Sequence, residues 1–297
     1  MNVEMAYLLG MIMGNGVITR GLTDTTIALY IPHKKLETEF YHDVSVYVKA
    51  SIVDIRNILE PLLVRPITFT HEKNVSILSF TESNESYLIR EIIRYVGGAT
   101  SSYNMRISPE IFRFTSDERK GFIRGFADVT GYIRRSNYAY FEPNYRVYFE
   151  IPRNWWMVID FCNMLKSVDV PVQSIDWAHP NMRDANLKKF NDGNYDFWKK
   201  EHQVKVWAAE YAPIGFIVIH KQEALNYFAQ KEVEQYIYKG IDPRTQLHKY
   251  YWEKAQRIRV KPSHPGENDE FIPKEIRGKH YNSWTEIAYD LGYNKES

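Results

Sequence analysis

Two stretches of the sequence decide the fold: LLGMIMGNG at residues 8–16 and IRGFADVTG at residues 123–131. Each stretch has the apolar character of a core helix and carries glycine at its third and ninth positions. Each leads into a short apolar and basic run, VITR at 17–20 and YIRR at 132–135. Gly10 and Gly125 are 115 residues apart, which is about the length of one small α+β domain. This repetition predicts a chain built from two copies of one unit.

The residues after each stretch predict the same order of elements. In the first half we expect strands at 16–20 and 25–31, a helix at 52–62, strands at 67–70 and 75–80, and a helix at 87–96 that ends at Gly97. In the second half we expect strands at 131–138 and 145–151, a helix at 155–165, strands at 172–177 and 204–208, and a helix at 223–238. The order αββαββα therefore occurs twice, and the predicted fold class is α+β.

The two copies divide the chain into four parts. We expect a first repeat at 1–100, a linker at 101–116, a second repeat at 117–239 with a polar insertion at 179–200, and a C-terminal extension at 240–297. In the extension, mixed basic and aromatic residues predict a helix at 250–258. Ser283 and Glu286 have the spacing of a capping box, which predicts a second short helix there.

Composition bounds the class of protein. The 297 residues are 44% hydrophobic and 25% charged, and 38 Lys and Arg against 37 Asp and Glu leave a net charge of +1. No whole-molecule field attracts nucleic acid, so any nucleic-acid surface must be local. The single cysteine, Cys162, excludes internal disulfides and thiolate metal sites. We find neither a targeting segment nor the roughly 18 to 20 apolar residues of a membrane span, so we expect a cytoplasmic, monomeric protein with no membrane partner.

The two glycine-containing stretches resemble the motif helices of the LAGLIDADG homing endonuclease family in its single-chain, two-repeat form. The resemblance implies two pseudo-symmetric αββαββα repeats with paired central helices and two antiparallel sheets that form a saddle over double-stranded DNA. The residues agree with close helix packing, because glycines four positions apart share one face and leave no Cβ atoms between the backbones. The helix-packing residues would be Gly10, Gly14, Gly121 and Gly125.

The eighth position of each motif bears on catalysis. The resemblance implies that in active members of the family this position is an acid, which holds divalent metal beside the scissile phosphates. Mg²⁺ is a hard cation and requires such carboxylates. Here the eighth positions are Asn15 and Thr130, both neutral. Asp128 occupies the sixth position, where we expect a local pairing. We therefore expect no metal site and no cofactor, with Mg²⁺ only if the chain is catalytic, and a scaffold that does not cleave by itself.

Alternating positions on the hairpins are candidates for reading base edges, because a sheet in the major groove presents every second side chain. The candidates are Arg20, Thr26 and Tyr30 on the first hairpin, Arg134, Ser136, Tyr138, Asn144, Arg146 and Tyr148 on the second, and Lys254 and Arg257 in the extension. The first hairpin is the poorer in Arg and Lys. Lys73 and Lys205 lie in or beside the fourth strand of each repeat, where the family often keeps a basic residue near the phosphates.

The leading hypothesis is a sequence-specific double-stranded DNA-binding protein on a degenerate homing endonuclease scaffold. It would be the recognition subunit of a restriction-type complex with other protein subunits, or a regulator. One alternative is an active or nicking homing endonuclease with unusual ligands. Another is a module whose sheets bind RNA or a partner protein, with which the aromatic content is compatible.

Overall fold

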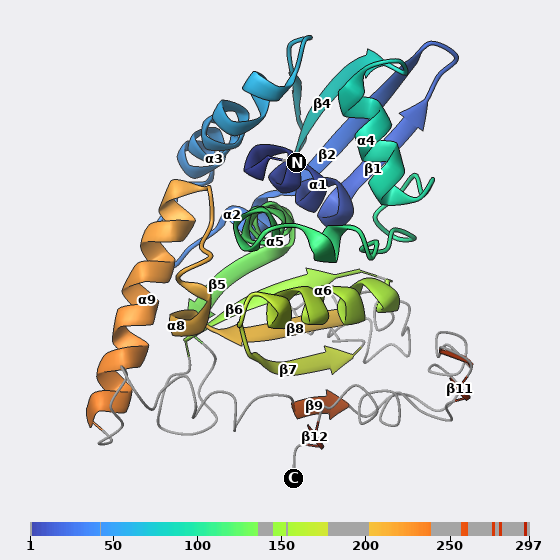
Figure 1. Ribbon diagram of the computed structural model, residues 1–297. Helices are drawn as coiled ribbons and strands as arrows, with labels where there is room; N and C mark the ends of the chain where they lie inside the picture. Colours follow the sequence, from blue (N-terminus) through green and yellow to red (C-terminus); the bar gives the residue numbers. More distant parts are fainter. Residues whose placement is uncertain are drawn as a thin grey trace, which may run out of the picture.

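The computed structural model describes residues 2–41, 43–135, 145–152, 154–177 and 202–238, with short strands at 257–260, 275–276, 279–280 and 294–295. Two units, each with a sheet and covering helices, lie one above the other in Figure 1, and two central helices, α1 and α5, lie between the sheets. The first unit is blue to green, and the second is green to orange.

The first unit has the predicted order of elements. Its sheet is antiparallel in the order β1-β2-β4-β3. Helix α4 ends as predicted at Gly97, which has a positive φ of 62°. The elements are α1 (Val3–Asn15), β1 (Gly16–Arg20), β2 (Asp24–Pro32), α2 (His33–Leu36), α3 (Val44–Leu59), the 3₁₀ turn η1 (Glu60–Leu62), β3 (Thr68–His71), β4 (Val75–Ser83) and α4 (Tyr87–Val96).

The second unit repeats that order. Its four antiparallel strands run β5-β6-β8-β7, which is the strand order of the first sheet. The elements are the 3₁₀ turn η2 (Ile111–Arg113), α5 (Ser116–Thr130), β5 (Gly131–Arg135), β6 (Tyr145–Ile151), α6 (Trp155–Ser167), β7 (Val172–Trp177), β8 (His202–Trp207), α8 (Ala208–Tyr211) and α9 (Ile219–Tyr238). The α+β class and the doubled αββαββα order are confirmed.

The extension differs from its prediction. Where the end of a helix at 250–258 was expected, β9 (Arg257–Val260) pairs in parallel with β7 and widens the second sheet. The other short strands are β10 (Glu275–Ile276), β11 (Lys279–His280) and β12 (Asn294–Lys295), of which β12 pairs with β9. The residues before 257, the capping box at Ser283 and the insertion at 179–200 lie outside the described residues.

Two helices begin earlier than predicted. Helix α3 starts at Val44 because the Asp43 side chain caps it, accepting from the backbone N–H groups of Ser45 and Val46. The apolar pattern used for prediction starts later, since Val44 and Val46 in the first turn are exposed. Helix α9 likewise starts at Ile219.

The connection between the units is packed into both of them. The Ile18 N–H donates to the Thr100 carbonyl at 2.8 Å, so the chain leaves the first unit along the edge of β1. The Asn154 side chain donates to the carbonyls of Ser102 and Met105, each at 2.8 Å. Arg106 forms two bonds to the Asp160 carboxylate, at 2.6 and 2.9 Å. The segment predicted as a linker is therefore part of the core between the repeats.

Helices α1 and α5 pack backbone to backbone through their glycines. A Cβ atom on Gly10 would lie 2.0 Å from the Phe122 carbonyl oxygen, and one on Gly125 would lie 1.9 Å from the Tyr7 carbonyl oxygen. Tyr7 and Phe122 are themselves 115 residues apart, so the contact is reciprocal, as a two-fold axis requires. The predicted pseudo-symmetric helix pair is present. Gly14, against Val129, and Gly121, against Val3, complete it.

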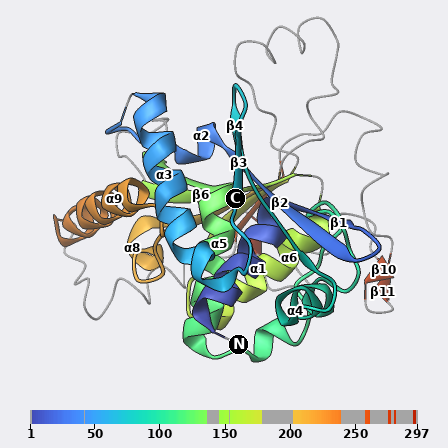
Figure 2. The ribbon, with the colours of Figure 1, turned by 90° about the horizontal axis from the view of Figure 1, so that it is seen from above.

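Helix α9 of the second unit also holds the first unit. The His220 side chain lies 2.6 Å from the Leu36 carbonyl oxygen, and Asp54 accepts from the Ile219 N–H at 2.9 Å. Helices α3 and α9 lie on one side of the α1–α5 pair and α4 lies on the other, as Figures 1 and 2 show. Among the described helices, none combines the length and apolar character that a membrane span requires.

Candidate nucleic-acid interface

Both central helices run directly into the first strand of their sheet. Gly16 and Gly131 have extended backbones, with φ of −108° and −93°, and each N–H donates to the carbonyl four residues back. Glycine is needed there for space, because a Cβ on either residue would lie within 2.7 Å of that carbonyl oxygen. Asn15 is therefore the last helical residue of α1 and is not followed by the left-handed turn that an Asn-Gly pair favours. The two helix ends fix where the sheets begin.

The two eighth-position side chains bond to nearby backbone. The Asn15 amide nitrogen donates to the Tyr30 carbonyl at 2.8 Å, which ties the end of α1 to β2. The Thr130 hydroxyl donates to the Phe126 carbonyl at 2.7 Å, and its residue is 3% exposed. Each side chain has a structural role, and together they supply one amide oxygen and one buried hydroxyl oxygen as possible ligands.

Asp128 is buried and paired, but its partners come from distant segments of the chain, so the expected local pairing is not what the structure shows. Its carboxylate accepts from the Tyr7 hydroxyl at 2.9 Å and from the Ile217 N–H at 3.0 Å. The Lys221 ammonium of α9 lies 3.7 Å from it and donates to the carbonyls of Ala127, Asp128 and Gly131 at 3.0 to 3.3 Å. Burial lowers the pKa of Lys221 to about 8 and raises that of Asp128. A lysine thus supplies the positive charge at the end of α5.

This set of donors does not fit a pair of Mg²⁺ ions. Such a site needs carboxylates that face the metal, whereas the sixth-position carboxylate is occupied by Tyr7 and Lys221. Among the described residues, no group of three or more His, Cys, Asp or Glu side chains has a metal-binding arrangement.

The second sheet carries a basic and aromatic row on its outer face, the face turned away from the core residues Ile133, Val147 and Phe149. Among the described residues of β5, β6 and β8 on this face, only Tyr132, Arg134, Arg146 and Glu150 are partly exposed. Tyr132 of β5 is paired with Tyr148 of β6, and their rings stack with centroids 5.3 Å apart. The Arg134 guanidinium lies 5.0 Å from the centre of the Tyr148 ring, and the Lys205 ammonium lies 5.6 Å from it. Cation–π contacts of this kind hold long basic side chains over the sheet.

Arg134 and Arg146 stand directly opposite each other on β5 and β6. Both side chains are half-buried, and the Nε atom of each is buried without a hydrogen-bond partner. No carboxylate pairs with either of them among the described residues. Like charges placed opposite each other destabilise a sheet, and an unpaired buried N–H also costs free energy. The pair therefore lacks an anion or a set of acceptor atoms.

Deeper on the same face, acid and base are paired. Glu150 of β6 binds the ammonium groups of Lys34, at 3.1 Å, and Lys35, both on α2 of the first unit. Burial alone would raise the pKa of Glu150, but the two ammonium groups lower it to about 2. Tyr148, Gln203, Lys205 and Trp207 are each at most 7% exposed. The solvent-accessible basic groups of this row are thus the two arginines near the hairpin end.

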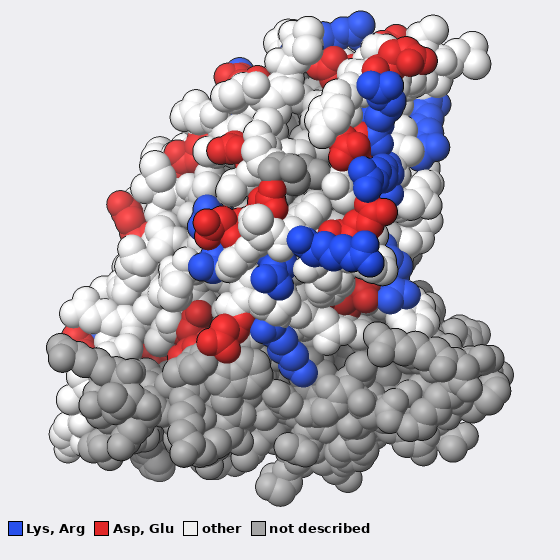
Figure 3. Space-filling view, in the orientation of Figure 1, with Lys and Arg blue, Asp and Glu red and all other residues white. Residues whose placement is uncertain are grey.

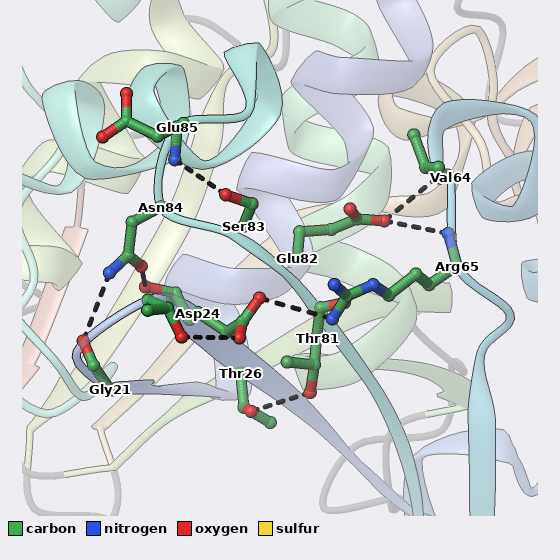
Figure 4. A network of polar contacts seen from close by, with 12 residues as sticks. Gly21, Asp24, Thr26, Val64, Arg65, Thr81, Glu82, Ser83, Asn84 and Glu85 are labelled. Atoms are coloured by element: carbon green, nitrogen blue, oxygen red, sulfur yellow. Dashed lines mark hydrogen bonds and ion pairs between the residues drawn. The ribbon is translucent and has the colours of Figure 1, made fainter.

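The first sheet presents hydroxyl groups instead. Thr26 of β2 is paired with Thr81 of β4, and their hydroxyl oxygens are 2.8 Å apart. Thr68 of β3 bonds in the same way to Ser79 at 2.7 Å. At the end of this sheet the Arg65 guanidinium is paired with Asp24 at 3.3 Å (Figure 4). This face therefore presents hydroxyl groups and almost no charged side chain that lacks an ion-pair partner among the described residues.

The structure separates the predicted reading residues. Thr26 and Tyr30 lie on the open face of the first sheet. Arg20 pairs with the buried Thr25, so it lies on the opposite face of the sheet. Arg134, Arg146 and Tyr148 share the outer face of the second sheet, where Tyr148 is buried, and Arg135 turns away to Glu39 at 3.1 Å. The backbone of Arg257 lies in β9. Ser136, Tyr138, Asn144 and Lys254 lie outside the described residues.

Several residues of this surface were not among the predicted ones. Tyr132 and Glu150 lie an even number of positions from Arg134 and Arg146 in their strands. The two-residue period of a strand could therefore have placed both of them on this face. Lys34 and Lys35 carry no such signal, because they reach the second sheet only through the stacking of the two units. By the register of the two sheets, the counterpart of Lys205 is Ser79. Lys73 is not equivalent to Lys205, because it lies in the turn between β3 and β4.

Charge on the helical side of the molecule is mixed. In Figure 3, which has the orientation of Figure 1, basic and acidic side chains lie side by side over the described residues. A mixed face produces no single-sign field. Over the described residues of this face, acidic and basic side chains therefore lie close enough to offset one another.

No protein-family model and no curated protein matches the sequence. Solved structures do resemble the fold. A variant of the homing endonuclease I-DmoI in complex with its target DNA is 13% identical, covering 75% of this chain and 97% of its own, with a TM-score of 0.40. The LAGLIDADG meganuclease I-AabMI bound to uncleaved DNA is 11% identical, covering 86% and 99%, with a TM-score of 0.39.

I-CpaMI, a LAGLIDADG meganuclease also bound to uncleaved DNA, is 11% identical and covers 81% of this chain and 93% of its own, with a TM-score of 0.37. LAGLIDADG homing endonucleases, which the glycine helices resemble in sequence, are thus also the solved structures to which this chain is similar.

Proposed function

We propose that this chain binds double-stranded DNA sequence-specifically, on a degenerate homing endonuclease scaffold, and does not cleave it by itself. The observation that carries the proposal is the opposed pair Arg134 and Arg146, which has no carboxylate partner among the described residues. Guanidinium groups donate paired hydrogen bonds to phosphate or to guanine O6 and N7. A duplex on this face would supply the acceptors and the negative charge that the pair lacks.

The absence of cleavage is proposed from the ends of α1 and α5. Asn15 and Thr130 bond to backbone carbonyls, and Asp128 is occupied by Tyr7 and Lys221. A protein that recognises a site without cutting it suits the recognition subunit of a restriction-type complex, or a regulator. Partner subunits of that kind belong to the proposal.

Binding is tested by selection from random duplexes, followed by fluorescence anisotropy on the selected site at physiological salt. Arg134→Ala and Arg146→Ala should each weaken binding about tenfold, because each removes one guanidinium contact. Arg135→Ala is the matched control, since Arg135 lies on the neighbouring position but is paired with Glu39. It should change the affinity less than threefold. Failure to select any site, or equal loss in all three variants, would refute the proposal.

Cleavage is tested by incubating the selected duplex with Mg²⁺ or Mn²⁺. The unaltered chain should leave both strands intact, and strand breaks would support the alternative of an active or nicking endonuclease. The double variant Asn15→Asp with Thr130→Asp supplies two carboxylates at the helix ends. Metal-dependent nicking by that variant alone would identify the missing acids as the reason for inactivity. Preferential competition by structured RNA in the binding assay would favour the RNA-binding alternative.

A further inference from the structure

The two sheets present different chemistry at equivalent positions. Gly16 and Gly131 start the first strand of each sheet and pair with Leu29 and Phe149, so the registers of the two hairpins correspond residue by residue. The fourth strands follow from the same registers. The counterparts on the faces turned away from the core are Thr19 and Arg134, Thr26 and Arg146, Val17 and Tyr132, Ala28 and Tyr148, Ser79 and Lys205, and Thr81 and Trp207, of which Tyr148, Lys205 and Trp207 are buried.

The first sheet offers methyl and hydroxyl groups. Thr19, Thr26 and Thr81 form one row across three strands, next to a row that contains Val17 and Ala28. A threonine hydroxyl can donate or accept, so it distinguishes bases poorly, whereas the methyl groups of Thr and Ala pack against the C5-methyl of thymine. The described strands of this sheet place no Lys or Arg on the open face.

The second sheet offers donors of fixed geometry. Arg134 and Arg146 replace two of the three threonines, and the Arg134 guanidinium is held over the stacked rings of Tyr132 and Tyr148, 5.3 and 5.0 Å from their centres. A guanidinium held in place loses little freedom when it binds the O6 and N7 atoms of guanine. Thymine methyl groups find no equivalent small-residue row here.

We infer that the DNA target is chemically asymmetric, with an A·T-rich half-site read by the first sheet through thymine methyl groups and a guanine-containing half-site read by Arg134 and Arg146. The inference rests on the proposed function and adds the base composition of each half. It also assigns unequal roles to the halves, because bidentate guanine contacts discriminate bases strongly and methyl contacts do so weakly.

Base analogues in the selected duplex test this assignment. Replacing guanine by 7-deazaguanine removes the N7 acceptor, and replacing thymine by uracil removes the C5-methyl group. We expect 7-deazaguanine in one half-site to weaken binding about tenfold and uracil in the other to weaken it about two- to fivefold. Each analogue in the opposite half should change binding less than twofold. Anisotropy titrations give the four dissociation constants.

Two variants connect each half-site to its sheet. Arg146→Ala should reduce the 7-deazaguanine penalty and leave the uracil penalty unchanged. Thr26→Ser keeps the hydroxyl that bonds to Thr81 but removes the methyl group, so it should reduce the uracil penalty alone. Arg20→Ala should change neither penalty, because Arg20 lies on the opposite face of β1.

The outcomes separate the two proposals. A palindromic selected site, or analogue penalties that are equal in both halves, would refute the asymmetric target while leaving DNA binding intact. Coupling of the 7-deazaguanine penalty to Thr26→Ser would refute it as well. Absence of any selected site would refute DNA binding itself, and the asymmetric target with it.

Discussion

Arg134 lies directly opposite Arg146 in the register of β5 and β6, at the positions that Thr19 and Thr26 hold in the first unit. In the protein without ligand, this pair opposes folding, because two guanidinium groups repel each other and their Nε atoms are buried without acceptors. A position that weakens the fold is expected where binding requires it.

Replacing one arginine of the pair should therefore stabilise the protein while weakening DNA binding. We expect Arg146→Gln to raise the free energy of unfolding by about 0.2–1 kcal/mol, the range for cross-strand pairs. Arg134→Gln should raise it less, because Arg134 also loses its contacts with the Tyr132 and Tyr148 rings. Urea unfolding without DNA measures it. Arg135→Gln is the control, since it removes an ion pair with Glu39 and should leave stability unchanged or slightly lower. A loss of stability in both pair variants would contradict the interpretation.

Gly10→Ala should unfold the protein or destabilise it by at least about 3 kcal/mol, because its Cβ would overlap the Phe122 backbone carbonyl, which cannot move without separating the helices. Gly14→Ala is the matched substitution in the same helix. Its Cβ would meet a methyl group of the Val129 side chain at 2.6 Å, so a side chain and not a backbone carbonyl must shift, and the higher helix propensity of Ala offsets about 1 kcal/mol. In thermal unfolding, Gly10→Ala should have a much lower melting temperature than Gly14→Ala. Equal losses of stability would argue against contact between the helix backbones.

The Glu150 carboxylate gives a testable dependence of stability on pH. Its folded pKa of about 2 lies below the ordinary value of 4.5, so its ion pairs stabilise the protein above pH 4.5, and the contribution is lost as pH falls toward 2. The effect amounts to about 3 kcal/mol at most. The free energies of unfolding of the unaltered chain and of Glu150→Gln should differ most near pH 6 and converge only at about pH 2. A constant difference across this range would contradict the pairing with Lys34 and Lys35.

Removal of the Lys221 ammonium should destabilise the protein by about 3–5 kcal/mol, because Asp128 would remain as a buried, uncompensated carboxylate. Lys221→Met tests this in urea. Adding Asp128→Asn removes the unpaired charge but keeps an oxygen for Tyr7 and Ile217. The double variant should therefore lose at least about 1 kcal/mol less than the sum of the single losses. Additive losses would show that the two groups act independently.

Much of the fold was predictable because its signals are local. The glycines of α1 and α5 lie one helical turn apart, and their repetition at 115 residues specified two units before any contact was known. Strand period placed Arg134, Arg146 and Tyr148 on one face, because alternate residues of a strand point the same way. These inferences need only the neighbours of each residue along the chain.

The remaining features depend on contacts between distant segments. The Lys35 ammonium meets Glu150 from 115 residues away, and Lys221 reaches the Asp128 carbonyl from 93 residues away. Neither residue stands in a recognisable motif. The predicted helix in the extension was wrong at its end for a related reason, since Arg257–Val260 pairs with β7, far back in the sequence. Basic and aromatic residues fit a helix or an added strand equally well, and only the partner decides.

The reciprocal seating of Gly10 and Gly125 against carbonyls of the opposite helix ties the two repeats into one indivisible body. Either repeat cut out by itself would expose a bare strip of main chain, so neither half is a natural building block for engineering. Hybrids assembled from halves of different proteins would first have to preserve these glycine contacts between the helices. Only then could they exchange the surfaces that bind a ligand.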